Sequence, residues 1–124
     1  MPGNILIVDD DDAIRETMVS ALEILGYGAD SASNGQEALE KIANSRPCLI
    51  LLDLMMPVMD GSQFCKAQQN DPTIADIPVI VFSADVAVAK KASLLNAVGS
   101  LKKPIDLLTL KAVVQDFCGE SHRA

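Results

Sequence analysis

The sequence of 124 residues has no tryptophan, one histidine and only 3% aromatic residues, and it is short of positive charge. Its 10 Lys and Arg stand against 17 Asp and Glu, which gives a formal net charge of −7. Nucleic-acid binding depends on basic side chains that neutralise phosphates, so no nucleic-acid partner is expected. Long apolar runs are also missing. The longest, Cys48 to Leu52, is far below the roughly 20 residues of a membrane-spanning helix, so no membrane segment is expected.

Cysteine is scarce too, and its pattern bears on where the protein works. Cys48, Cys65 and Cys118 are an odd number of cysteines and lack the spacing of metal ligands. A chain of this length buries enough apolar surface to fold without cross-links. No cationic segment precedes an apolar run at the N-terminus, so no secretory signal is expected. We therefore predict three reduced thiols in a cytoplasmic protein.

What the sequence does contain is an alternation of two kinds of segment. Short runs rich in β-branched residues are followed by longer stretches with apolar residues at steps of three and four. Ile5–Val8 and Leu49–Leu52 are apolar at consecutive positions, as in central parallel strands that are covered on both faces. The predicted strands are Ile5–Val8, Gly28–Ala32, Leu49–Leu52, Val79–Phe82 and Ser100–Lys102, and the predicted helices are Ala13–Leu25, Gln36–Asn44, Ser62–Asn70, Val86–Asn96 and Leu107–Phe117.

This alternation predicts an α/β fold in which a doubly wound parallel sheet of five strands is flanked by five helices. Residues 1–124 are expected to form one domain, with a core from about residue 4 to residue 118 and a tail at 119–124. No output domain is expected after it. At the helix starts, Asp11 and Asp12 are expected to cap the first helix. The second helix has two possible capping boxes, one beginning at Ser33 and one at Asn34, and the sequence does not choose between them.

Acidic residues follow two of the predicted central strands. Asp9 and Asp10 come directly after Ile5–Val8, and Asp53 comes directly after Leu49–Leu52. Ligands of such sheets bind beyond the carboxyl ends of the strands, so these carboxylates should converge there. Like charges this close destabilise a fold unless a cation neutralises them, and Mg²⁺ prefers oxygen ligands. The sequence therefore predicts a Mg²⁺ site formed by these three aspartates.

Two residues of different character follow the last two predicted strands. Ser83 comes directly after Val79–Phe82, and Lys103 comes directly after Ser100–Lys102. Taken singly, each is most simply a turn residue or a solvated residue. Beside the acids they are placed to bind a phosphoryl group, because a lysine neutralises its charge and a hydroxyl donates a hydrogen bond to it. A carboxylate can accept a phosphoryl group, and Asp53 is the acid nearest the middle of the predicted sheet.

These segments together carry a resemblance to a known family. In chain order they are Asp9-Asp10 after Ile-Leu-Ile-Val, Leu51-Leu-Asp53-Leu-Met-Met-Pro57-Val-Met-Asp-Gly61, Ser83-Ala84 and Lys103-Pro104. Over about residues 4–118 the chain resembles the receiver domain of bacterial response regulators, of the single-domain type. The resemblance implies a flavodoxin-like sheet with strand order 2-1-3-4-5. It also implies a phospho-accepting switch of a two-component system or phosphorelay, and a regulatory domain rather than an enzyme.

The resemblance assigns the residues that accept the phosphoryl group and hold the metal. Asp53 corresponds to the aspartate that accepts a phosphoryl group from a histidine of a sensor histidine kinase or a histidine phosphotransfer protein. Asp10, Asp53 and the backbone carbonyl of Met55 correspond to Mg²⁺ ligands, and Asp9 corresponds to the acid that helps through a water molecule.

The resemblance also describes the phosphorylated state. Lys103 corresponds to the lysine that pairs with the acyl phosphate, and Ser83 to the hydroxyl that moves toward it and changes the surface of the fourth helix, fifth strand and fifth helix. An unknown downstream protein would bind there, and the chain is expected to be a monomer or a weak homodimer. Two departures stand out. Ser100 replaces the usual aromatic residue of the switch, and Asp85 can change the lifetime of the acyl phosphate in either direction.

Two other interpretations remain open. A phosphorylation-independent interaction module would keep the fold while Ser100 disables the switch, and its partner binding would not change on Asp53→Ala. A phosphatase similar to the haloacid dehalogenase superfamily would use Asp9 as its nucleophile and leave Asp53 idle. Such phosphatases usually need a longer chain and further acids late in the sheet.

Overall fold

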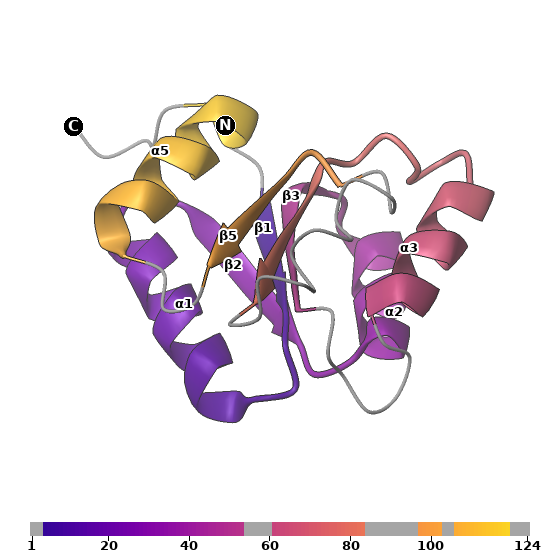
Figure 1. Ribbon diagram of the computed structural model, residues 1–124, viewed down its shortest axis with the longest axis horizontal. Coiled ribbons are helices and arrows are strands. Elements are labelled where there is room, and N and C mark those ends of the chain that lie inside the picture. The colour runs from indigo at the N-terminus through magenta and orange to yellow at the C-terminus, as the bar shows by residue number, and fades with distance from the viewer. Residues whose placement is uncertain (1–3, 54–60, 84–96, 103–105, 120–124) are drawn as a thin grey trace.

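The computed structural model describes residues 4–53, 61–83, 97–102 and 106–119 (Figure 1). Its strands form one parallel five-stranded sheet in the order β2-β1-β3-β4-β5, which confirms the predicted topology. In chain order the described elements are β1 (Asn4–Val8), α1 (Asp12–Ile24), β2 (Gly28–Ala32), α2 (Gly35–Asn44), β3 (Pro47–Asp53), α3 (Gly61–Asn70), β4 (Val79–Ser83), β5 (Gly99–Lys102) and α5 (Leu107–Cys118).

The described strands and helices lie where the sequence predicts them, with ends that differ by at most two residues. The predicted helix Val86–Asn96 lies outside the described residues. Among the helices that the structure does describe, none is both long enough and apolar enough to cross a membrane.

Helices cover both faces of the sheet. α1 and α5 lie on one face, and α2 and α3 lie on the other (Figure 1). Because successive side chains of a strand point to opposite faces, Ile7 of β1 packs on the α1 and α5 side and Leu6 packs on the α2 and α3 side. Leu51 and Leu52 of β3 divide in the same way, and all four residues are buried. Because helices cover both faces of the sheet, polar functional side chains can reach solvent at the ends of the strands.

Polar side chains cap the helix starts. Asp11 caps α1, because its carboxylate accepts hydrogen bonds from two backbone N–H groups of the first turn. Asn34 caps α2 by accepting a hydrogen bond from the backbone N–H of Glu37 at 2.8 Å, so the structure selects Asn34 over Ser33. The Glu37 carboxylate accepts a hydrogen bond from the Ser33 hydroxyl at 2.7 Å, and this bond is the main cause of its lowered pKa.

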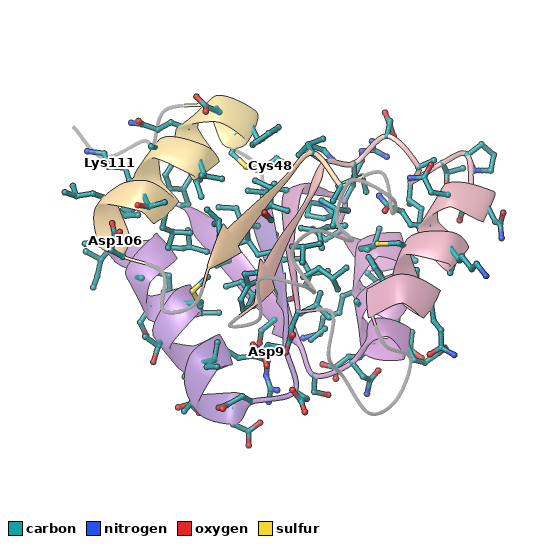
Figure 2. All side chains as sticks on the ribbon, in the orientation of Figure 1. Asp9, Cys48, Asp106 and Lys111 are labelled. Carbon is teal, nitrogen blue, oxygen red and sulfur yellow. A yellow bond between two sulfur atoms is a disulfide. The ribbon has the colours of Figure 1, made fainter. Side chains whose placement is uncertain are left out.

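The prediction of three reduced thiols is wrong for two of them. Cys48 and Cys118 form a disulfide with their Cα atoms 5.5 Å apart, while Cys65 is free and buried. The bonded residues are separated by 70 positions, so no local spacing indicates the pair. They meet because α5 packs against the sheet and brings its last residue to the beginning of β3. Figure 2 shows the labelled Cys48 at this end of the sheet, next to α5.

Candidate functional site

The site lies at the carboxyl edge of the sheet, where β1 and β3 end side by side. In the register of these strands Val8 lies opposite Leu52, which brings Asp9 and Asp53 to adjacent positions. Asp9 is fully buried, Asp53 is 5% exposed and Asp10 is exposed. One carboxylate oxygen from each of the three aspartates lies within 4.8 Å of the other two. The structure thus brings together the three acids that the sequence predicted.

Hydrogen bonds fix the loop that carries two of these acids. The backbone N–H of Asp9 donates to the carbonyl of Ala32 at 3.1 Å, and its carboxylate accepts from the backbone N–H of Asp11 at 2.9 Å. From α1, Arg15 donates through Nη1 to the backbone carbonyl of Asp9 at 2.7 Å and through Nη2 to the carboxylate of Asp12. Figure 2 shows Asp9 at the end of the sheet opposite to Cys48.

The donor set suits a hard divalent cation. All three side chains are carboxylates, so the group offers only oxygen ligands. Carboxylates that are buried together need a neutralising charge, and Mg²⁺ is commonly held by one or two of them with several waters retained. The exposed position of Asp10 leaves the group in contact with solvent on one side, where such waters fit.

The other predicted site residues are described only in part. Ser83 is the last residue of β4, with its Cα opposite that of Lys102 in β5, so it lies at the same edge of the sheet as the acids. Lys103 and the backbone carbonyl of Met55 lie outside the described residues. Ser100 lies in β5 and is exposed.

Arg15 is a residue of this site that the sequence interpretation missed. It follows Asp12 by three residues, a spacing at which helical side chains face each other, and that signal was available. The contact of Arg15 with the backbone carbonyl of Asp9 has no such signal in the sequence, because only the path of the folded loop brings that carbonyl to the guanidinium. The Arg15 side chain is 16% exposed, so it forms part of the wall beside the acids.

Comparison with known proteins identifies the family. Residues 5–115 match the response regulator receiver domain. The chain belongs to this family. A curated relative, the response regulator MprA of Mycobacterium sp. strain KMS, is 40% identical to this receiver domain over 114 residues. The match covers 90% of this chain and 49% of the relative, so the chain spans about half the length of that protein.

Solved structures of receiver domains have the same fold. The chemotaxis protein CheY4 of Vibrio cholerae has a TM-score of 0.86 and 29% identity, over 94% of this chain and 99% of that chain. A putative response regulator from Chloroflexus aurantiacus has a TM-score of 0.88 and 28% identity, over 97% of this chain and 100% of that chain. The family match makes this receiver domain a regulatory module of two-component signalling. It therefore favours the receiver interpretation over the phosphatase.

Proposed function

We propose that this receiver domain is a phospho-accepting switch in which Asp53 receives a phosphoryl group from a phosphohistidine. The donor would be a sensor histidine kinase or a histidine phosphotransfer protein. One observation carries the proposal: Asp53 is a buried carboxylate at the end of a central strand, within 4.8 Å of the carboxylates of Asp9 and Asp10. Burying like charges together opposes folding, so the cluster is better explained by chemistry than by packing.

In this proposal Mg²⁺ would be held by the carboxylates of Asp10 and Asp53 and the backbone carbonyl of Met55, with Asp9 acting through a water molecule. When bound, the ion would neutralise charge between Asp53 and the incoming phosphoryl group. The backbone N–H of Asp11 orients the Asp9 carboxylate for this role by donating a hydrogen bond to it.

The chain's own residues would perform the transfer. An oxygen of the Asp53 carboxylate forms a bond to phosphorus, and the bond between phosphorus and the histidine nitrogen breaks. That nitrogen keeps the electron pair of the broken bond and returns to the neutral imidazole once the protons are rebalanced with solvent. Lys103 would neutralise the phosphoryl oxygens, and the hydroxyl of Ser83 would donate a hydrogen bond to one of them. The position of Ser83 supports its role, because β4 is the strand next to β3.

The signal would leave through the surface of β5, α5 and the helix predicted at 86–96. Ser83 supports this route because it pairs with Lys102, so a shift at the end of β4 is passed directly to β5. Since the exposed Ser100 cannot bury or expose a ring, the output would depend on the backbone shift. We propose that the domain works in the cytoplasm as a monomer or weak homodimer and acts on a downstream protein.

Intact mass after incubation with Mg²⁺ and phosphoramidate tests this proposal. Wild type is expected to gain the mass of one phosphoryl group, and Asp53→Asn is expected to gain none because an amide is not a nucleophile for phosphorus. Asp116→Asn is the matched control, since Asp116 is an exposed aspartate of α5, and it should react like wild type. If wild type stays unmodified while a known receiver domain reacts, the acceptor role is wrong.

One observation favours a second candidate, a phosphorylation-independent interaction module. Ser100 is an exposed serine, so the aromatic switch of the family is missing here. Once a downstream partner is found, its affinity for wild type treated with phosphoramidate decides between the two. Affinity that is unchanged by phosphoryl transfer and by Asp53→Asn would support the second candidate.

Arg15→Ala is expected to weaken Mg²⁺ binding about tenfold, measured by titration calorimetry. Arg15 is the side chain of α1 that holds both the Asp9 carbonyl and the Asp12 carboxylate, so its removal loosens the loop that carries Asp9 and Asp10. Removal of the guanidinium charge would by itself favour a bound cation, so weaker binding reports the lost positioning of the metal ligands.

Arg46→Ala is the matched control for Arg15→Ala. Arg46 also donates to a backbone carbonyl, that of Thr73 at 2.5 Å, and to a carboxylate, that of Asp76 at 2.6 Å. It precedes β3, at the end of the sheet opposite to the acids. Equal Mg²⁺ affinities for the two variants would show that Arg15 has no specific role in positioning the site.

A further inference from the structure

We propose that Cys48 and Cys118 are a reversible redox pair, whose reduction by a protein dithiol of the thioredoxin class releases the last turn of α5. The pair would be a second input to the receiver domain, separate from the acidic site. This inference does not depend on the proposed phosphorylation, because the two sites lie at opposite ends of β3.

The disulfide joins a central strand to the end of a helix. Cys48 is the second residue of β3, and Cys118 is the last residue of α5. Both residues are half-buried and pack against the core cluster between the sheet and the α1 and α5 helices. The bond is therefore neither enclosed in the core nor detached from it. A reductant can approach the sulfurs from solvent, and the packing nearby responds when the bond is cut.

Other contacts keep α5 attached when the disulfide is absent. Leu110 and Val114 of α5 are buried in the same core cluster. The hydroxyl of Tyr27 donates to the carbonyl of Gly119 at 2.5 Å, directly after the helix end. Because these contacts lie on both sides of the last turn, reduction should loosen residues 115–118 without releasing the helix. A bond that is not needed for the fold is one that can be opened and closed.

The cytoplasmic location proposed above, on which this step rests, favours reversibility over a permanent cross-link. Disulfides are rare in the cytoplasm, where thiol reductants keep cysteines reduced, and those that form are usually transient and redox-sensing. A domain of this length does not need a cross-link to build its core. A half-buried disulfide in such a domain is therefore better explained as a regulated bond than as a structural one.

The reaction is a two-electron exchange that balances within the two proteins. A thiolate of the reductant attacks one sulfur of the disulfide, which forms a mixed disulfide and releases the other cysteine as a thiolate. The second thiol of the reductant then displaces the remaining cysteine, and the released thiolates take up protons. The reductant ends as a disulfide, and Cys48 and Cys118 end as thiols. Oxidation runs the same steps in reverse with an oxidised dithiol protein.

Cys65 is an internal control for this chemistry. It is free and buried, and burial raises the pKa of its thiol to about 11. Since only the thiolate reacts, Cys65 should resist alkylation at neutral pH in the folded protein. Any alkylation of the native, reduced protein can therefore be assigned to the other two cysteines.

Native alkylation with iodoacetamide, read by intact mass, tests the redox pair. Oxidised protein should gain no adduct, and protein treated with reduced thioredoxin should gain two while its circular dichroism remains that of a folded domain. Removal of thioredoxin followed by glutathione disulfide should restore the unreactive form. Cys65→Ser should behave like wild type, whereas Cys48→Ser should leave Cys118 reactive without reduction. Two adducts before reduction, no reduction of the folded protein by thioredoxin, or complete unfolding on reduction would each overturn the proposal.

Hydrogen exchange shows whether reduction of the disulfide releases the last turn of α5 or leaves the helix unchanged. The backbone N–H of Gly119 donates to the carbonyl of Gln115 at 3.1 Å and closes this turn. On reduction its exchange should speed up at least tenfold, while exchange along β1 and β3 stays within about twofold. The Cys48→Ala/Cys118→Ala variant should match the reduced protein. Equal exchange of Gly119 in both redox forms would show that the bond has no effect on α5.

Discussion

Removing the Cys48–Cys118 disulfide is expected to lower the free energy of unfolding by about 4 kcal/mol. The bond joins residues 70 positions apart, and a cross-link that closes a long loop restricts the unfolded chain strongly. The folded chain loses little, because Leu110, Val114 and the hydrogen bond from Tyr27 still hold α5. Most of the effect therefore lies in the greater freedom of the unfolded state.

Urea unfolding followed by circular dichroism measures this loss. The comparison needs oxidised wild type, reduced wild type and the Cys48→Ala/Cys118→Ala variant. Reduced wild type and the variant should unfold at similar urea concentrations, both well below oxidised wild type, and the variant should not respond to reductant. If oxidised and reduced wild type unfold together, the cross-link does not stabilise the domain.

The second large effect is a gain in stability when the proposed phospho-accepting carboxylate of Asp53 is removed. Asp53→Asn is expected to raise the free energy of unfolding by about 1 to 3 kcal/mol in metal-free buffer. Asp53 is buried within 4.8 Å of two other carboxylates, and asparagine has nearly the same shape without the charge. The substitution removes repulsion and leaves the packing intact. Sites that are built for chemistry often cost stability in this way.

Mg²⁺ should reverse the order of these two proteins or close the gap between them. A ligand at ten times its dissociation constant stabilises the folded state by about 1.4 kcal/mol, and wild type should gain this while Asp53→Asn gains little. Thermal unfolding with and without Mg²⁺ measures the stability difference between the two proteins and the gain of each protein from the ion. Asp116→Asn again serves as the control, and it should respond to Mg²⁺ as wild type does. A destabilised Asp53→Asn protein in metal-free buffer would count against repulsion among the three acids.

The sequence was sufficient wherever the determining interaction is local or repeats along the chain. Apolar runs at consecutive positions predicted the buried strands β1 and β3, and the rule that parallel strands end at one edge brought Asp9 and Asp53 together. Both predictions are confirmed by the register of the strands and the distance between the carboxylates. The choice between Ser33 and Asn34 as the cap of α2 depends on the backbone path, so only the structure decides it, through the hydrogen bond from the backbone N–H of Glu37 to Asn34.

The sequence by itself therefore determined the parallel sheet and the group of acids, because hydrophobic periodicity and strand direction decide these features, while the order of the strands followed from the family resemblance. Only the tertiary structure decided the Cys48–Cys118 bond and the contact from Arg15 to the carbonyl of Asp9. The disulfide depends on where α5 lies against β3, which is distant along the chain. The Arg15 contact depends on how the loop before α1 bends back toward that helix. Contacts of that kind leave no spacing in the sequence, because they are set by the packing of whole elements.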